Sequence, residues 1–313
     1  MLGKLNTQVV RGKAVKNTAR RKKLKINWSA WFLLLPGLIL LYFMVWRPIF
    51  QGTWLSLFSL KGYTPVKFIG LDNYIRITSD TLFLKTLGNT CKYVGWSLLI
   101  GYLPPILVGI LLSEIAHAKG FFKFSIYFPV IVPTIAASMM WYYMYLPGPS
   151  GLLNMLLNLF GIAPWGWLQN SAATIPLIVL TCTWQGFGSS ALMYFAALQG
   201  INQELYEAVK IDGGGGRRRL FHIALPQIAP IMMLFLIRQM IITFQIMVHP
   251  MTMTAGGPNN ASVSLSLQAY KYAFIDFQIG KALAMGVISF LILMCLTVLY
   301  FYLEKKLDKG ASN

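Results

Sequence analysis

A run of four glycines at positions 213–216 is the first feature of the sequence that could carry chemistry, because glycine-rich loops cradle phosphate groups. Such a loop needs a strand before it and a Gly-Lys-Ser or Gly-Lys-Thr sequence after it. Neither accompanies this run, and no such pattern occurs elsewhere in the chain. We therefore expect that the chain does not itself hydrolyse ATP.

Three polar side chains lie inside long apolar stretches. Arg238 is the costliest of them to place in an apolar surrounding. Gln245 is seven residues further on, nearly two helical turns, and shares its face. Gln185 belongs to another stretch. These side chains either hydrogen-bond a polar solute in passage, or join helices or a second membrane subunit.

The other reactive residue types are scattered along the chain. The three histidines and three cysteines have no metal-ligand spacing, and no cluster of His, Asp, Cys or Ser has catalytic spacing. We therefore expect no metal site and no catalytic residue. The positions concerned are His117, His222 and His249, and Cys91, Cys182 and Cys295.

The composition defines the class of protein that carries these residues. Of 313 residues, 56% are hydrophobic and only 12% are charged, about half the charged share of a soluble protein. A soluble globule of this composition would aggregate. Disorder, a nucleic-acid-binding domain and a disulfide-stapled scaffold are excluded as well. The sequence predicts a multi-spanning integral membrane protein.

The net charge of +18 is concentrated near the N-terminus, where residues 1–25 hold nine Lys or Arg and no acid. A polynucleotide-binding arm is one interpretation, but no stacking aromatics lie between these charges. A basic run directly before an apolar segment is typical of a cytoplasmic flank.

Six stretches are long enough to cross a bilayer, for which about 20 apolar residues are needed. Between them, Lys and Arg are concentrated in alternate connections, so both termini are expected in the cytoplasm. Prolines and glycines within the stretches predict bent helices, either around a pathway or for packing alone. The predicted spans are 28–50, 90–112, 124–146, 173–198, 228–248 and 282–303.

The connection between the fourth and fifth spans, residues 203–226, is the most informative. Residues 204–211 predict a short amphipathic helix, which Asp212 and Gly213 end because glycine accepts a positive φ. A second short helix is expected over 217–224, stopping before Pro226. Two such helices projecting from a membrane form a docking element for a cytoplasmic partner.

This connection resembles the EAA signature of ABC-importer permeases, with its spacing kept. The resemblance implies a coupling helix that fits a groove of the ATPase subunit. Glu207 and Ala208 would seat the helix, Asp212 and Gly213 would shape the turn, and Leu225 and Pro226 would anchor the exit into the membrane. Arginines 217–219 would contact lipid headgroups or the ATPase.

Two departures from the signature are visible. Val209 replaces the usual second alanine, and glycines occupy 214–216. Because each glycine weakens a helix by up to about 1 kcal/mol relative to alanine, we expect looser coupling here.

The resemblance extends over most of the chain and is closest to the LplB-like permeases of oligosaccharide and polysaccharide uptake. It implies an all-α type I ABC-importer permease fold with six transmembrane helices, in the bacterial cytoplasmic membrane. It also implies a second homologous permease, giving a heterodimer, a solute-binding protein outside and an ATPase dimer that binds ATP and Mg. The supporting motifs are Leu33–Gly37, Phe68–Tyr74, Asn89-Thr90, Gly200–Ala208, Thr254–Pro258, Tyr270–Phe274 and Gly280.

The expected organisation is a basic cytoplasmic tail (1–27), a first span with its external loop (28–83), a five-helix core (84–303) and a cytoplasmic tail (304–313). The core contains the coupling loop, 199–226. An ion-gradient-driven secondary transporter is the alternative function. It would usually show mid-span acids and repeated halves, whereas the nine acids here lie in loops or near span ends.

Overall fold

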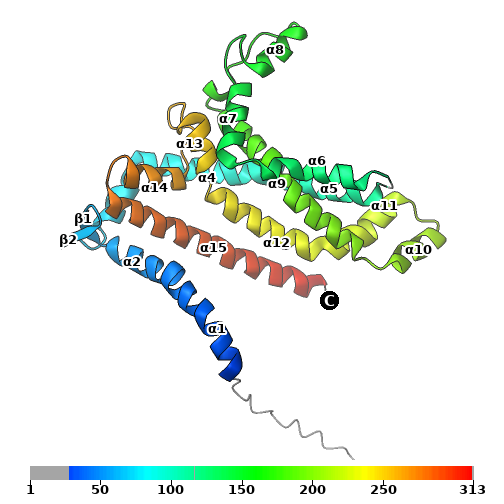
Figure 1. The fold of residues 1–313 in the computed structure, drawn as a ribbon, viewed down its shortest axis with the longest axis horizontal. Coiled ribbons are helices and arrows are strands. Elements are labelled where there is room, and N and C mark those ends of the chain that lie inside the picture. The colour runs from blue at the N-terminus through cyan, green and yellow to red at the C-terminus, as the bar shows by residue number, and fades with distance from the viewer. Residues whose placement is uncertain (1–27, 116, 312–313) are drawn as a thin grey trace, which may run out of the picture. The chain divides into compact units, whose positions relative to one another are not determined.

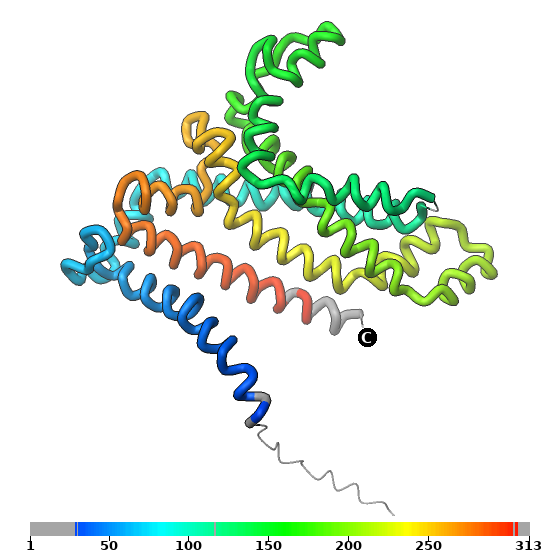
Figure 2. The backbone as a smooth tube through the Cα atoms, viewed as in Figure 1, coloured from blue at the N-terminus to red at the C-terminus, as the bar shows by residue number. Residues whose placement is uncertain are grey.

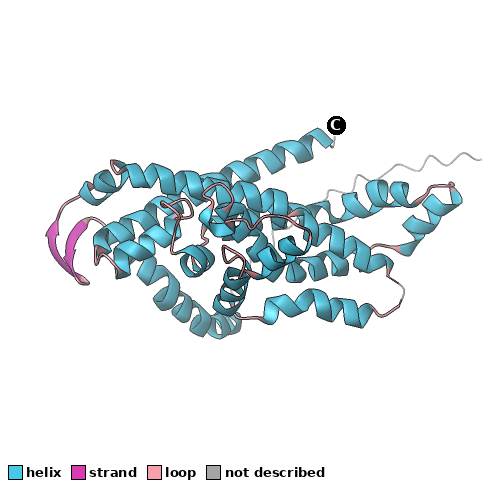
Figure 3. Cartoon of the chain, turned by 90° about the horizontal axis from the view of Figure 1, so that it is seen from above, coloured by secondary structure: helices cyan, strands magenta, loops and turns pink. Residues whose placement is uncertain are grey.

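The computed structural model describes residues 28–115 and 117–311 and is almost entirely helical, with one β-hairpin (Figure 3). The predicted basic tail, 1–27, lies outside the described residues. The helices are α1 (Trp28–Leu41), α2 (Arg47–Leu55), α3 (Asp72–Thr78), α4 (Thr81–Trp96), α5 (Leu103–Glu114), α6 (Lys119–Ile131), α7 (Thr134–Met144), α8 (Leu152–Leu159), α9 (Thr174–Gln199), α10 (Gln203–Ile211), α11 (Gly216–Arg219), α12 (Leu225–Phe244), α13 (Val248–Thr254), α14 (Leu265–Phe274) and α15 (Ile279–Ala311).

Short stretches of other geometry connect some of these helices without interrupting them. Wider π turns over Tyr42–Trp46, Ser97–Gly101 and Leu220–Ala224 join α1 to α2, α4 to α5 and α11 to α12. The hairpin pairs β1 (Phe58–Lys61) antiparallel with β2 (Thr64–Phe68), with Phe58 opposite Phe68.

The described residues form two compact units, divided between Phe50 and Gln51. The segment 51–83, which the sequence analysis grouped with the first span, packs on α15 within the second unit. The side-chain amide of Asn73 and the carbonyl oxygen of Phe58 lie so close to Gly280 that a Cβ there would be 2.9 and 3.0 Å from them. The predicted C-terminal tail begins as a continuation of α15.

Five helices in the described part of the chain are long and apolar enough to cross a membrane. They agree with five of the six predicted spans. Their extents are Trp31–Leu55, Thr81–Glu114, Thr174–Gln199, Gly216–Phe244 and Ile279–Tyr302, and α6 with α7 makes a sixth if this bent pair is counted as one span.

The predicted third span is not one continuous helix. The chain turns by 94° between α6 and α7, and the turn is visible in the backbone trace (Figure 2). Val132, before Pro133, has ψ of 128°, because the proline ring disfavours the helical region for the preceding residue. Proline therefore breaks this span, whereas the prolines of α5 and α12 are accommodated within their helices.

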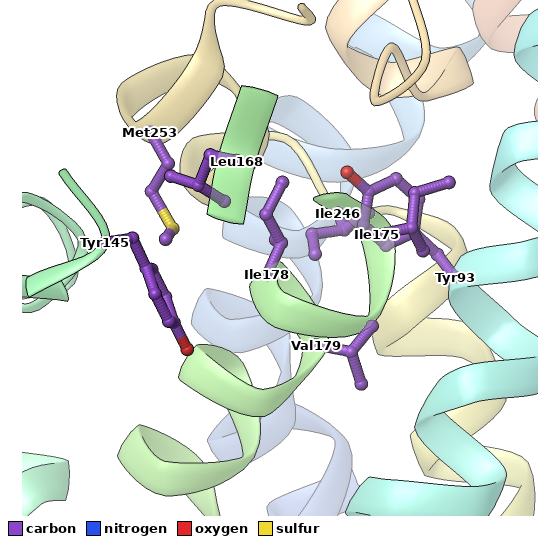
Figure 4. Packing of buried hydrophobic residues seen from close by; sticks show 8 residues of the cluster. All are labelled: Tyr93, Tyr145, Leu168, Ile175, Ile178, Val179, Ile246 and Met253. Atoms are coloured by element: carbon purple, nitrogen blue, oxygen red, sulfur yellow. The ribbon is translucent and has the colours of Figure 1, made fainter. Parts of the chain in front are cut away.

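Two buried clusters show that α6 and α7 together carry the chain from one end of the bundle to the other. Ile106 of α5 and Leu198 of α9 share a cluster with Ile228 of α12. At the far end, the first turns of α9 pack with Tyr93 of α4 and with Ile246 and Met253 (Figure 4). Helix α6 starts after α5, and α9 begins at the opposite end of the bundle. The bent pair of α6 and α7 therefore crosses the bundle once, as a single span would.

Helix α6 lies directly against α9. A Cβ at Gly188 would collide with the backbone carbonyl of Ile126 in α6, so no larger residue fits there. Close approach through small residues is the usual way in which helices associate in a membrane.

Side-chain hydrogen bonds hold the end of the bundle that carries the hairpin and α14, opposite α10 (Figure 1). The Asn89 amide donates to the carbonyl oxygens of Asn260, at 2.8 Å, and Val263, at 3.1 Å. The Tyr93 hydroxyl donates to the Ser262 carbonyl at 3.0 Å. The loop after α13 is thereby fixed to α4.

Candidate functional site

The predicted docking helix is present as α10, one residue longer at its start than expected. Its N-cap is Asn202, whose side-chain oxygen accepts a hydrogen bond from the backbone N–H of Glu204 at 3.1 Å. Glu204 lies in the first turn and Lys210 in the last, the arrangement that the helix dipole favours.

Glycine ends α10 through a Schellman motif. Gly213 has φ of +71°, its N–H donates to the Lys210 carbonyl at 3.2 Å, and the N–H of Gly214 donates to the Val209 carbonyl at 2.8 Å. A Cβ at Gly214 would lie 2.9 Å from that same carbonyl oxygen, whereas Gly215 and Gly216 have open space around them. Gly213 and Gly214, the first half of the glycine run, are therefore required by the geometry of this turn.

No residue of α10 is buried in this chain. Glu207 and Ala208 are exposed, and Ile211 is 85% exposed. Figure 1 shows the helix projecting beyond the ends of α9 and α12. The helix thus presents apolar and acidic side chains that nothing in the described chain covers.

The second part of this connection differs from the expectation. Instead of a short helix that stops before Pro226, α11 continues through the π turn into α12, making one helix from Gly216 to Phe244. The N–H of Leu225 donates to the Leu220 carbonyl, five residues back. This wider turn makes room for the proline ring, which then occupies the first turn of α12, where a missing N–H is tolerated. Leu225 and Pro226 begin a membrane helix.

Arg219 links this connection to the end of α5. Its guanidinium lies 3.6 Å from the Glu114 carboxylate and 5.2 Å from the centre of the Tyr206 ring in α10. The sequence analysis suggested that Arg219 contacts headgroups or the ATPase. Arg219 instead contacts two other elements of its own chain, while Arg217 and Arg218 are exposed.

A cavity of about 420 Å³ lies deeper in the bundle. Residues of α6, α7, α9, α12, α13 and the π turn after α4 line it. Gln185 and Arg238, two of the three predicted path residues, are among them. Gln245, the exposed C-cap residue of α12, is not among them.

Gln185 satisfies the backbone where the third span breaks. Its amide nitrogen donates to the carbonyl oxygen of Val132 at 2.9 Å, and its amide oxygen is 3.1 Å from Nε2 of His249, which donates. Broken backbone at membrane depth needs such a partner. His249 is held by this contact, and burial lowers the pKa of its imidazole to about 4. Among the described residues, no group of three His, Cys, Asp or Glu could hold a metal ion.

Arg238 has a different environment. Its guanidinium carbon lies 5.8 Å from the centre of the Phe235 ring, one turn earlier in α12. The ion pairs within the described residues are Asp72–Arg76 and Glu114–Arg219, so Arg238 has no carboxylate partner there. The cavity thus combines hydrogen-bonding groups with one uncompensated cation.

Comparison with known proteins agrees with this arrangement. The family described as binding-protein-dependent transport system inner membrane component matches residues 95–309. The chain is 30% identical over 271 residues to the probable ABC transporter permease protein YurN of Bacillus subtilis (strain 168), covering 85% of this chain and 92% of that protein. It is also 30% identical over 295 residues to the sn-glycerol-3-phosphate transport system permease protein UgpA of Escherichia coli O157:H7, covering 92% and 98%.

A solved structure shares the fold. It is a bacterial alginate ABC transporter in complex with an alginate pentasaccharide-bound periplasmic protein, and its matching chain gives a TM-score of 0.79 at 20% identity over 90% of this chain and 96% of that chain. The family match and these relatives therefore define the class, a membrane-embedded transport subunit. This chain belongs to the family of inner membrane components of binding-protein-dependent transport systems, so it is a transport protein rather than an enzyme.

Proposed function

We propose that this chain is one of two homologous permease subunits of an ATP-driven importer, with an ATPase dimer docked on α10. The supporting observation is α10 itself, which is capped at both ends and exposes an acidic and apolar surface. ATP and Mg would bind to the partner ATPase, and the chain supplies the mechanical link. The side of the membrane that carries α10, both termini and most of the basic residues is the cytoplasm.

The substrate is a saccharide or a related polyol, delivered by a solute-binding protein and passed through the cavity around Gln185 and Arg238. The named relatives support this class, since one transports sn-glycerol 3-phosphate and the solved neighbour was captured with an alginate pentasaccharide. The polar lining suits a hydroxyl-rich solute, because each hydroxyl needs a partner once it leaves water.

Reconstitution tests the proposal. The chain is co-expressed with its sister permease, ATPase and binding protein, and uptake of labelled oligosaccharides is measured in proteoliposomes. We expect uptake that requires ATP and stops with Glu207→Lys, because a reversed charge on exposed α10 prevents ATPase attachment without affecting insertion. Glu304→Lys, the same reversal within α15, is the control and keeps its ATPase. Uptake driven by an ion gradient without ATP contradicts the proposal, and so does full ATPase co-purification with Glu207→Lys.

A further inference from the structure

The cavity contains a single formal charge. Its lining combines serine, threonine, glutamine and histidine with apolar side chains, and Arg238 is the one charged residue among the described residues that line it. The two ion pairs of the described chain lie elsewhere, in α3 and at the end of α5. The guanidinium therefore has no anionic partner among the residues that the structure describes.

The other polar groups of the cavity do not change this balance. The Gln185 amide is committed to Val132 and His249. Burial lowers the pKa of His249 to about 4, so the imidazole is neutral at physiological pH. The Thr183 hydroxyl donates to the carbonyl oxygen of Val179 at 2.8 Å. Gln239 lines the cavity beside Arg238 and has no hydrogen bond to another described residue.

A neutral solute would leave this charge uncompensated. An arginine within a membrane span is costly unless it is paired, and the Phe235 ring 5.8 Å away compensates only part of a positive charge. Carboxylate and phosphate oxygens match the guanidinium fork with two parallel hydrogen bonds. An anionic ligand would gain this interaction at Arg238, which is exposed in this chain and therefore open to a solute.

We infer that the cavity selects anionic saccharides or sugar phosphates, with Arg238 binding the carboxylate or phosphate and Gln239 available for hydroxyl groups. Arg238 is then the residue that determines specificity in this subunit. The inference rests on the proposed function, because it assumes that the substrate passes through this cavity. A carboxylate of the second permease is the competing partner for Arg238.

Ligand binding to the assembled transporter without its binding protein tests the inference, because the binding protein would impose its own selectivity. Two pairs of probes are compared, trigalacturonate with its carboxyl-reduced neutral form and sn-glycerol 3-phosphate with glycerol. We expect at least one anion to bind about 10- to 100-fold more tightly than its neutral counterpart, as hydrogen bonds to charged groups provide. This preference should shrink with added salt. The pair that shows it distinguishes a carboxylate site from a phosphate site.

Three variants test whether Arg238 causes the preference for anions. Arg238→Gln should remove it, and Arg238→Lys, which keeps the charge, should retain most of it. Arg76→Gln removes an exposed arginine that pairs with Asp72 at 2.6 Å and should leave the preference unchanged. Retention of the second permease is measured for each variant.

Several outcomes overturn the inference. They are equal binding of charged and neutral probes, binding of none of them, an unchanged preference in Arg238→Gln, and loss of the second permease from that variant. ATP-driven uptake separates these outcomes from failure of the proposed function. If neutral saccharides are taken up with ATP while no anionic preference exists, the function stands and the inference fails. If no saccharide or glycerol phosphate is taken up with ATP, the proposed function fails.

Discussion

At the scale of single residues, Gln185 shows how a membrane protein accommodates broken backbone. Pro133 ends α6 and frees the Val132 carbonyl in a region where no bulk water can satisfy it. One buried amide serves this carbonyl and the His249 imidazole together. Sequence analysis identified Gln185 as a candidate for substrate contact. Both ends of its amide are already bound within the protein, so its geometry is that of a structural group in the cavity wall.

Replacing Gln185 with leucine should therefore destabilise the subunit. The Val132 carbonyl and His249 would both lose their partner, and each unsatisfied buried group costs about 1–3 kcal/mol. Thermal unfolding of the purified subunit should show a clear loss. Ser189→Ala is the matched control, because that cavity-lining hydroxyl donates only to the nearby Gly186 carbonyl. Equal midpoints for the two variants would contradict the assigned role.

The His249 imidazole predicts a pH dependence of stability. Burial lowers its pKa from 6.5 to about 4, so between these values the unfolded chain binds a proton that the folded chain does not. The contribution of His249 to the free energy of unfolding is complete above about pH 6.5 and is lost as the pH falls towards 4. The thermal midpoint should fall across this window, and His249→Gln should flatten the decrease. His222→Gln, at an exposed position, should leave it unchanged, and a steep decrease in both variants would contradict the assignment.

At the scale of elements, the turn after α10 divides the run of four glycines into two halves. Gly213 and Gly214 are required by a positive φ and by close packing against Val209, while Gly215 and Gly216 are not constrained by neighbours. The effect of the glycine run on coupling to the ATPase stays a prediction. Substitutions in its two halves distinguish a constrained turn from general flexibility as the cause.

We expect Gly214→Ala to impair ATPase attachment, because its Cβ would press against the Val209 carbonyl and side chain. Overpacking of this kind costs about 1–3 kcal/mol and would tilt or unravel the end of α10. Gly215→Ala, one residue later in open space, is the control and should retain its ATPase. Co-purification and transport-coupled ATP hydrolysis measure both variants. Equal loss in both would indicate that flexibility of the whole run, rather than the Schellman turn, matters.

The contact between Arg219, Glu114 and Tyr206 ties α10 to α5 and α11. Both charged side chains are substantially exposed, at 40% and 64%, and exposed pairs contribute about 0–1 kcal/mol. Glu114→Gln should therefore change stability little, yet loosen the connection between the docking helix and the membrane helices. We expect a lower ratio of solute transported to ATP hydrolysed. Glu204→Gln, an acid outside this contact, should keep the ratio, and an unchanged ratio in Glu114→Gln would show that the pair is passive.

At the scale of the whole molecule, the sequence predicted those structural features that depend on residues close together in the chain. Apolar length located the membrane helices, and Asp212 and Gly213 located the end of α10. What the sequence could not show depends on long-range pairing. Glu114 and Arg219 meet from distant segments, and Asn89 reaches the loop after α13. The sequence also does not distinguish Pro133, which breaks its helix, from Pro226, which does not.

The membrane topology is the largest consequence of the bend between α6 and α7. The buried clusters place the start of α9 at the end opposite the start of α6, so the residues between α7 and α8 should face the outside and α10 the cytoplasm. Single cysteines at Ser150 and Gly215 test this after the native cysteines are replaced with serine. Ser150 is exposed, and Gly215 is exposed in open space.

We expect a membrane-impermeant thiol reagent to label Ser150→Cys in intact spheroplasts and Gly215→Cys only after permeabilisation. The reason is physical, since the basic residues around α10 are retained on the cytoplasmic side and the α6–α7 pair then has to cross the bilayer once. A cysteine at Thr64, in the exposed hairpin, is the control and should be labelled from outside. Labelling of positions 150 and 215 from the same side would mean that α6 and α7 return to the side on which they entered. The two ends of α9 would then have to lie on that same side, against the packing of both clusters.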